Sequence, residues 1–257
     1  MPIISTAGLA RTFTGRSGPV EAVRGIDLTV RPGEILGLLG PNGAGKTTTL
    51  RMLTTLLPPT GGAATVAGHD LVKDPAAVRR RIGYVAQSGG LDPQETVRSE
   101  LVLQGRLYGL DRTRATARAE ELAVDLDLTE LLDRPTPALS GGQRRRLDLA
   151  MGLTHRPEIL FLDEPTTGLD PGSRADLWAL VRRLRDEHGT TVVLTTHYLD
   201  EADALADRIV VVDQGTVVAE GSPAALKAAH GAATLQDAFL AITGRGPAPA
   251  DTTPVAV

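Results

Sequence analysis

The chain contains no cysteine. Disulfides, thiolate zinc sites, iron–sulfur clusters and cysteine nucleophiles are therefore excluded, and the composition fits a reducing compartment. Long apolar runs are also missing, since runs such as residues 209–212 are far shorter than the roughly 18 residues of a membrane span. The amino-terminal residues lack the basic-then-apolar order of a secretory signal. Together these absences predict a soluble, cytoplasmic protein.

Excess positive charge is absent as well. The chain has 27 Lys and Arg against 31 Asp and Glu, a formal net charge of -4. A globally basic surface that would hold nucleic acid or an anionic membrane is thereby excluded. Aromatic residues are scarce, with one Trp, three Tyr and three Phe, and none interleaves with the basic run Arg144 to Arg146. We interpret this run, like Arg79 to Arg81, as a solvated or interfacial face, and expect no nucleic-acid partner.

The sequence does contain strands that alternate with helices, a pattern typical of a parallel sheet in an α/β fold. Apolar and polar residues alternate in short runs over residues 2–32, which predicts short antiparallel strands that form a β layer ahead of the core. A long segment with helical spacing, residues 93–132, is interpreted as a helical insertion. Further strands are expected at 34–39, 82–86, 159–162, 191–195, 209–212 and 217–220, and helices at 47–57, from 140 onward and at 172–187.

The carboxyl-terminal segment differs from the rest. Residues 244–257 carry Pro247, Pro249 and Pro254 among Ala and Thr, and they contain too little apolar surface to offset the entropy of ordering them. We predict a disordered tail there, after one domain that spans residues 1–243.

The segment Gly40 to Thr47 matches the pattern G-x-x-x-x-G-K-[ST], between a predicted strand and a predicted helix. Its glycines let backbone N–H groups converge on a polyphosphate, and the helix N-terminus adds the positive end of its dipole. Lys46 would reach the β and γ phosphates, and Thr47 would bind Mg²⁺. The alternative is a glycine-rich turn with a solvated lysine. The residues expected to hold the nucleotide are Gly40, Pro41, Asn42, Gly43, Ala44, Gly45, Lys46, Thr47 and Thr48.

Two acids end the apolar strand 159–162, where turn residues are usual. Asp163 is placed to bind Mg²⁺ through water, and Glu164 would polarise the attacking water as a general base. The alternative is a solvated strand end.

The string Leu139-Ser140-Gly141-Gly142-Gln143 precedes an amphipathic helix, with Ser140 as a natural N-cap. It predicts a second anion-binding helix start. One nucleotide does not need two such sites from one chain, so a site shared between two chains is the economical interpretation. The alternative is a plain helix start.

These strings resemble the ATP-binding subunit of ABC transporters. The phosphate loop, LSGGQ, LFLDEP and Thr195-Thr196-His197 occur in that family's order over about residues 3–243. The resemblance implies a P-loop NTPase (RecA-like) core with an antiparallel β layer and an inserted α-helical subdomain at about 88–150. It also implies a head-to-tail dimer with a second copy of the chain, in which two ATP molecules lie between the phosphate loop of one subunit and the signature of the other. The signature residues are Ser140, Gly141, Gly142 and Gln143.

Four further residues acquire roles from the resemblance. Gln87 resembles the Q-loop glutamine that touches Mg²⁺ and water, and His197 resembles the switch histidine that contacts the γ-phosphate and the catalytic water. Asp170 resembles the D-loop aspartate at the dimer interface, although it is also a natural N-cap before a proline. Phe13 resembles the aromatic residue that stacks on adenine. The implied catalytic residues are Glu164, His197 and Gln87, and the implied metal ligands are Thr47, Gln87 and Asp163.

Strings at 106–110, 144–150, 197–202 and 235–240 resemble the daunorubicin-resistance branch of drug exporters. This resemblance implies a separate type-2 membrane permease, a hydrophobic or antibiotic cargo, and a peripheral location on the inner face of the cell membrane. Glu95 departs from the branch, whose members often carry Leu at this permease-facing position.

The rival function is a soluble ABC ATPase in translation or DNA repair. The chain has a single cassette, and only about 93 residues separate Lys46 from Leu139, which disfavours that rival. A P-loop kinase or GTPase would leave LSGGQ and His197 unexplained.

Overall fold

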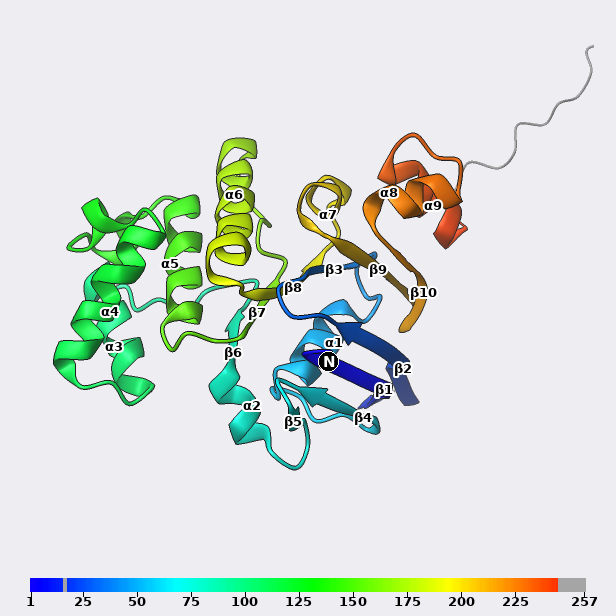
Figure 1. Ribbon diagram of the computed structural model, residues 1–257, viewed down its shortest axis with the longest axis horizontal. Helices are drawn as coiled ribbons and strands as arrows, with labels where there is room; N and C mark the ends of the chain where they lie inside the picture. Colours follow the sequence, from blue (N-terminus) through cyan, green and yellow to red (C-terminus); the bar gives the residue numbers. More distant parts are fainter. Residues whose placement is uncertain (16–17, 245–257) are drawn as a thin grey trace, which may run out of the picture.

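The computed structural model describes residues 1–15 and 18–244, which form two β-sheets with helices on both faces of the larger one (Figure 1). The strands are β1 (Ile4–Gly15), β2 (Gly18–Val30), β3 (Ile35–Leu39), β4 (Gly61–Val66), β5 (His69–Asp70), β6 (Ile82–Val85), β7 (Ile159–Asp163), β8 (Thr191–Thr196), β9 (Arg208–Asp213) and β10 (Thr216–Gly221). The helices are α1 (Lys46–Leu53), α2 (Pro75–Arg81), α3 (Val97–Leu107), α4 (Arg112–Asp125), α5 (Gly141–Leu153), α6 (Pro171–His188), α7 (Leu199–Leu205), α8 (Pro223–Ala229) and α9 (Leu235–Thr243), with 3-10 turns η1 (Thr129–Leu131) and η2 (Thr136–Ala138).

The larger sheet has the strand order β10-β9-β3-β8-β7-β6 and is parallel except for the β9–β10 hairpin. The predicted α/β class with a parallel sheet is confirmed. Its central strands β3, β7 and β8 are buried along their whole length, as continuous apolar runs require. Because these strands are parallel, their carboxyl ends meet at one edge, where Asp163 pairs with Thr195 and Leu39 with Thr196.

Alternate residues of β7 point into two different cores. Ile159 and Phe161 pack with side chains of α1 and the smaller sheet, whereas Leu160 and Leu162 pack with side chains of α3 to α6. The predicted helical insertion forms α3, α4 and η1, and Figure 1 shows α3 and α4 separated from the sheet by α5. The larger sheet therefore lies between two layers of packed side chains.

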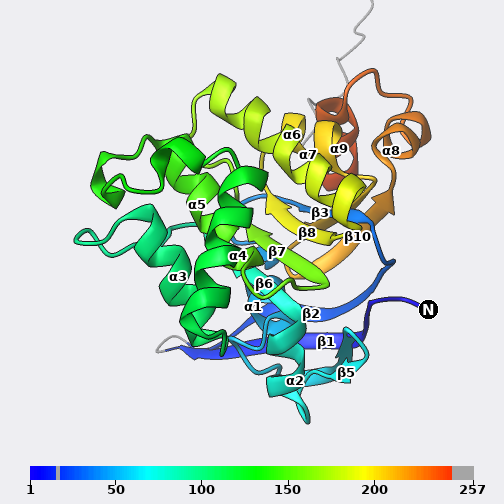
Figure 2. The same ribbon diagram turned by 60° about the vertical axis from the view of Figure 1, so that its left-hand side comes forward.

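The smaller sheet has the order β2-β1-β4-β5 and is antiparallel (Figure 2). The prediction of short strands over residues 2–32 is wrong, because β1 and β2 are long strands of 12 and 13 residues. Gly8 and Gly25 have positive φ values of 58° and 102° near shifts in register. These glycines therefore accommodate bulges within continuous strands and do not end them. Sequence analysis also missed β4 and β5.

Helix α1 is shorter than the predicted 47–57, because it ends at Leu53 before the prolines are reached. The Thr54 hydroxyl donates to the Leu50 carbonyl oxygen at 2.9 Å, and Thr55 adopts a φ of 63°. At the other end of the chain, Gly244 caps α9 with a φ of 66°, and the remainder of the predicted tail lies outside the described residues.

None of the helices in 1–15 and 18–244 combines the length and apolar character needed to cross a bilayer.

Candidate functional site

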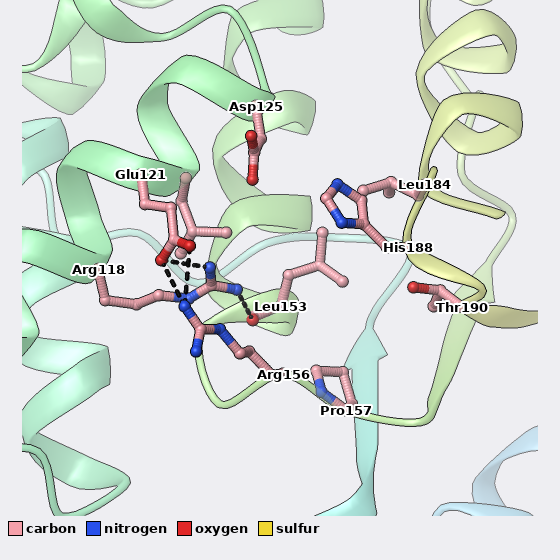
Figure 3. Close-up of a pocket in the computed structure, with 10 residues that line it drawn as sticks. Arg118, Glu121, Asp125, Leu153, Arg156, Pro157, Leu184, His188 and Thr190 are labelled. Carbon is pink, nitrogen blue, oxygen red and sulfur yellow. Dashed lines mark hydrogen bonds and ion pairs between the residues drawn. The ribbon is translucent and has the colours of Figure 1, made fainter. Parts of the chain in front are cut away.

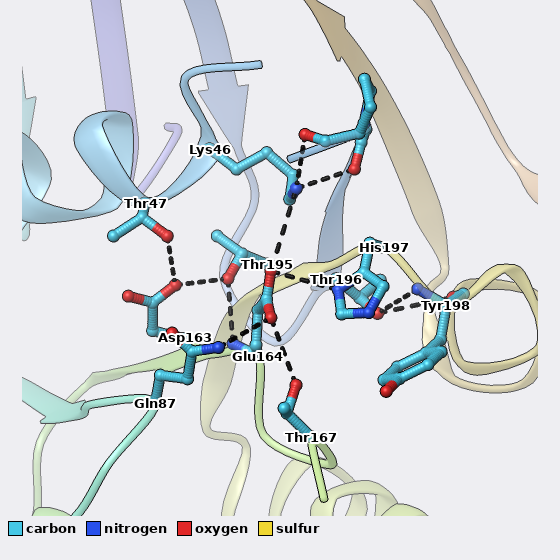
Figure 4. Close-up of polar contacts among 12 residues, drawn as sticks. Lys46, Thr47, Gln87, Asp163, Glu164, Thr167, Thr195, Thr196, His197 and Tyr198 are labelled. Atoms are coloured by element: carbon cyan, nitrogen blue, oxygen red, sulfur yellow. Dashed lines mark hydrogen bonds and ion pairs between the residues drawn. The ribbon is translucent and has the colours of Figure 1, made fainter. Parts of the chain in front are cut away.

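The carboxyl-end edge of β3, β7 and β8 opens into a cleft of about 600 Å³, a size suited to a small ligand. The β3–α1 loop forms one wall, and the segments that follow β6, β7 and β8 form the other (Figure 4). The lining residues are Ala22, Asn42, Gly43, Ala44, Gly45, Lys46, Thr47, Thr48, Gln87, Glu164, Thr167 and His197.

Two glycines allow the β3–α1 loop to pack closely against its neighbours. A Cβ on Gly40 would lie 2.1 Å from the Val212 carbonyl oxygen, and one on Gly45 would lie 2.5 Å from the Ala22 carbonyl oxygen. Gly45 also has a φ of 103° and is the N-cap of α1, so the first turn of this helix has no side-chain cap. The uncapped N–H groups and the helix dipole suit an anionic ligand.

The side chain of Lys46 is buried under this loop, with 4% of the residue exposed. Its Nζ donates to the carbonyl oxygens of Gly40 at 2.7 Å and Pro41 at 3.0 Å, and it lies 4.0 Å from Oε1 of Glu164. Burial lowers the pKa of Lys46, whereas Glu164 and Asp163 act to raise it. The ammonium therefore has capacity for a further anionic partner at the cleft.

Asp163 lies at the floor of the cleft, with 1% of the residue exposed. Its Oδ1 accepts hydrogen bonds from the hydroxyls of Thr47 at 2.8 Å and Thr195 at 2.7 Å, and its Oδ2 accepts from the Tyr84 hydroxyl at 3.4 Å. Burial first, and then the negative charge of Asp163, raises the pKa of Tyr84. The structure thus brings together Thr47 and Asp163, and adds Thr195 and Tyr84, which sequence analysis missed.

The oxygen atoms of Thr47 and Asp163 match the ligand chemistry of Mg²⁺. Within the described part of the chain, no group of three or more His, Cys, Asp or Glu side chains could hold a metal ion. A divalent ion at the cleft would therefore need further oxygen ligands from water or from a bound phosphate group, which is the usual arrangement for Mg²⁺.

Glu164 occupies the centre of the cleft (Figure 4). Its φ of 45° is in the left-handed region, and its N–H donates to the Thr195 carbonyl and hydroxyl oxygens at 3.2 and 3.0 Å. Its Oε2 accepts from Nε2 of Gln87 at 3.0 Å and from the Thr167 hydroxyl at 3.2 Å. A left-handed conformation is costly for a non-glycine residue and is often found at functional sites.

The ring of His197 flanks the same carboxylate. Its Nδ1 lies 3.2 Å from Oε1 of Glu164 but outside hydrogen-bond geometry, so this buried nitrogen has no hydrogen-bond partner in the described structure. The ring packs on Tyr198, with centroids 4.1 Å apart. The three residues predicted to be catalytic therefore lie together, with Gln87 and His197 on either side of the Glu164 carboxylate.

The signature residues form a second cluster with Asp170. Ser140 and Gln143 make a capping box, in which the Gln143 N–H donates to the Ser140 hydroxyl at 3.2 Å and the Ser140 N–H donates to Oε1 of Gln143 at 3.0 Å. A Cβ on Gly142 would lie 2.9 Å from the Ser173 hydroxyl, which donates to Asp170 at 2.6 Å. None of these residues lines the cleft. One chain therefore holds the predicted nucleotide contacts in two separate places.

Phe13 belongs to neither cluster. It lies on β1 opposite Val20, with 37% of its surface exposed. The Arg11 guanidinium lies 4.8 Å from the centre of its ring, and Phe13 is not among the lining residues of the cleft. Ala22 of β2 is the residue of the smaller sheet that reaches the cleft.

The interpretation of Arg144 to Arg146 as a solvated or interfacial face is wrong for Arg145, which is 6% exposed. Arg144 is exposed, and Arg146 is partly buried beside Asp127 and Asp176. The three side chains point in different directions around α5, so a run of like charges does not make one face.

A second cavity, of about 280 Å³, lies between α4, the segment after α5 and the end of α6 (Figure 3). Arg118 and Arg156 both pair with Glu121 there, at 2.8 Å. Arg118 also donates to the carbonyl oxygens of Leu153 at 2.8 Å and Thr154 at 3.1 Å. These arginines are paired within the chain, and the cavity contains none of the predicted site residues.

A family model described as ABC transporter matches residues 23–167. The chain is 51% identical to the daunorubicin/doxorubicin resistance ATP-binding protein DrrA of Streptomyces peucetius, over 91% of this chain and 69% of that protein. It is 46% identical to the doxorubicin resistance ATP-binding protein DrrA of Mycobacterium tuberculosis (86% and 66%). It is 43% identical to the Nod factor export ATP-binding protein I of Burkholderia lata (84% and 71%).

Solved structures of ATP-binding cassettes are also similar to this chain, at lower sequence identity. The ATP-binding cassette MJ0796, solved as a dimer in a post-hydrolysis state bound to ADP and Pi, is similar with a TM-score of 0.77 and 26% identity, over 85% of this chain and 98% of that one. An ATP-binding subunit of an ABC transporter is similar with a TM-score of 0.80 and 26% identity, over 94% and 99%.

Proposed function

Because this chain belongs to the ABC transporter family as one of its ATP-binding subunits, we propose that the cleft around Lys46 and Glu164 is its ATPase site. The family binds ATP and hydrolyses it to drive transport. The observation that supports this site is the single Glu164 carboxylate, held by Gln87 and Thr167 next to the paired Thr47 and Asp163. We assign residues 1–243 to one nucleotide-binding domain, with a helical subdomain at about 88–150.

The phosphate groups of ATP bind in the β3–α1 loop. Residues Gly40 to Thr48 supply converging N–H groups, and Lys46 supplies the charge. Thr47, Asp163 and Gln87 would hold Mg²⁺, which would supply positive charge beside the phosphate groups.

Glu164 is the general base. Its carboxylate orients a water molecule and accepts the proton as this water attacks the γ-phosphate. Gln87 fixes the carboxylate from one side. His197, whose Nδ1 lies beside the carboxylate on the other side, contacts the γ-phosphate and the water.

A second copy of the chain completes each site. Ser140 to Gln143 and Asp170 lie away from the cleft of their own chain, and Ser140, Gly141 and Asp170 are exposed. In a head-to-tail dimer, these residues of one chain close over the ATP held by the other. The similar cassette MJ0796 is itself dimeric.

The dimer works with a type-2 membrane permease on a separate chain, at the inner face of the cell membrane. Its cargo is a drug, an antibiotic or another hydrophobic compound exported from the cell. The DrrA relatives, which are named for daunorubicin and doxorubicin resistance, support this cargo class. Translation and DNA repair are not favoured, because the relatives named above act in resistance or export.

Glu164→Gln tests the assignment of the base. Turnover should fall by about 10²- to 10⁴-fold, the usual contribution of a general base, while an ATP-bound dimer accumulates because the phosphate contacts remain. Phosphate release and size-exclusion chromatography measure the two effects. Glu158→Gln, at the opposite end of β7 and paired with Arg81, is the matched control and should behave as wild type. Wild-type turnover in Glu164→Gln would remove this residue from the mechanism.

A further inference from the structure

The buried guanidinium of Arg145 lies between two segments that border the cleft. Its Nη1 donates to the Ala86 carbonyl oxygen at 2.6 Å, immediately before Gln87. Its Nε donates to the Pro165 carbonyl oxygen at 2.8 Å, immediately after Glu164, and its Nη2 donates to the Asp163 carbonyl oxygen at 3.3 Å. One side chain of α5 thus bonds to the backbone on both sides of Glu164 and in front of Gln87.

Asp148, one turn later in α5, accompanies this guanidinium. Its Oδ2 lies 3.6 Å from Nη1 of Arg145, and the two side chains are 10% and 7% exposed. Burial raises the pKa of Asp148 and lowers that of Arg145, while each charge opposes the shift of the other. A Cβ on Gly89 would lie 2.3 Å from Oδ1 of Asp148, so the segment after Gln87 packs directly on the pair.

The backbone at Glu164 needs such support. Its left-handed φ of 45° persists only where the surrounding structure determines it. β8 holds the N–H of Glu164 through Thr195, whereas the carbonyl groups of the neighbouring residues 163 and 165 are held by Arg145. Pro165 has no N–H of its own to contribute.

We propose that Arg145 is a positioning residue of the ATPase site, which fixes Gln87 and Glu164 relative to each other through the backbone carbonyls of Ala86, Asp163 and Pro165. This inference rests on the proposed function. Arg145 acts through the backbone and does not touch the substrate. Its planar guanidinium is suited to the role, because five N–H donors in a fixed fork can serve three acceptors in different directions.

A purely structural role is the competing explanation, and a double variant separates the two. Arg145→Met alone leaves Asp148 buried without its partner, so both stability and activity should fall. Arg145→Met with Asp148→Asn removes both charges, and most of the stability should return, since buried ion pairs often contribute little net stability. If Arg145 positions the site, kcat does not return with the stability.

Arg118→Met is the matched control. Arg118 is also a shielded arginine that bonds to two backbone carbonyls and pairs with an acid three residues later in its helix, but its carbonyls belong to Leu153 and Thr154, away from the cleft (Figure 3). It should lose stability and keep the wild-type kcat at temperatures well below its Tm.

The experiment measures thermal unfolding, kcat and KM for ATP, and amide hydrogen exchange of the nucleotide-free protein. For the double variant we expect a kcat at least 10-fold below wild type, a KM within about 3-fold, and exchange at least 10-fold faster in segments 86–90 and 164–168. A kcat within 2-fold of wild type, unchanged exchange in these segments, or an equal loss of kcat in Arg118→Met would overturn the inference. If the wild-type chain hydrolysed no ATP, the proposed function itself would fail, which distinguishes the two failures.

Discussion

The cleft around Lys46 concentrates buried charge, whereas the edge formed by Ser140 to Gln143 and Asp170 is exposed or partly exposed and makes its hydrogen bonds within its own helices. In the cleft, Lys46 and Asp163 are almost fully buried and Glu164 is held in a left-handed conformation. At the edge, Ser140 completes a capping box and Asp170 caps α6. Buried charges are costly unless they are paired, whereas helix caps stabilise the fold. The buried charges of the cleft would therefore gain from a charged ligand, whereas the edge residues already form their hydrogen bonds within a single chain.

This comparison predicts that changes at the edge block assembly and leave the single chain intact. Ser140→Arg should abolish the ATP-dependent dimer, and turnover with it, because a bulky cation would occupy the surface that faces the partner. ATP affinity of the monomer, measured by calorimetry, should stay within about 2-fold of wild type. The control is Ser222→Arg, since Ser222 is also an exposed N-cap, at α8. A normal ATP-driven dimer in Ser140→Arg would contradict the shared-site proposal.

Changes in the cleft should instead act on nucleotide binding within one chain. Lys46→Ala should weaken ATP binding roughly 10- to 100-fold, the loss expected for hydrogen bonds to a charged partner. Lys73→Ala is the matched control, because Lys73 is an exposed lysine paired with Asp70. Unchanged ATP affinity in Lys46→Ala, measured by calorimetry, would argue against its role.

A smaller effect is expected at Glu201, a fully buried acid of α7 that lies outside both clusters. Its Oε1 accepts from Nε1 of Trp178 at 3.2 Å. Burial is the main cause that raises the pKa of Glu201, and hydrogen bonds offset only part of this rise. The folded protein therefore retains a proton that the unfolded chain loses above its ordinary pKa, so stability falls as pH rises from about 4.5 towards the folded pKa.

Glu201→Gln removes this loss, because the amide does not titrate and can still accept from Trp178. The variant should be more stable than wild type at neutral pH by on the order of 1 kcal/mol, with the difference shrinking as the pH falls towards 4.5. Urea unfolding at several pH values measures it. Asp200→Asn, an exposed neighbour paired with Arg174, should change stability by less than about 0.5 kcal/mol. A pH-independent difference for Glu201→Gln would be the contrary outcome.

Local sequence patterns were sufficient for the parallel sheet and for Glu164 at a strand end, whereas the resemblance to the family drew attention to Gln87 and His197. Each of these residues follows a buried strand, and the carboxyl ends of parallel strands meet at one edge. The supporting residues were not predictable in this way. Thr195 reaches Asp163 only through the register of β7 and β8, and Arg145 is buried in the middle of a basic run. Bulges at glycines likewise hid the true length of β1 and β2, because glycine also marks strand ends.

The central claim is that the cleft of one chain is completed by the edge of another, and mixing two defective chains tests it most directly. One chain carries Lys46→Ala and the other Ser140→Arg, both with Glu164→Gln to trap ATP. Neither should dimerise alone. Their mixture should form a heterodimer that retains one ATP, against two in the Glu164→Gln dimer, because one intact cleft then meets one intact edge. A mixture that stays monomeric with ATP would contradict the claim.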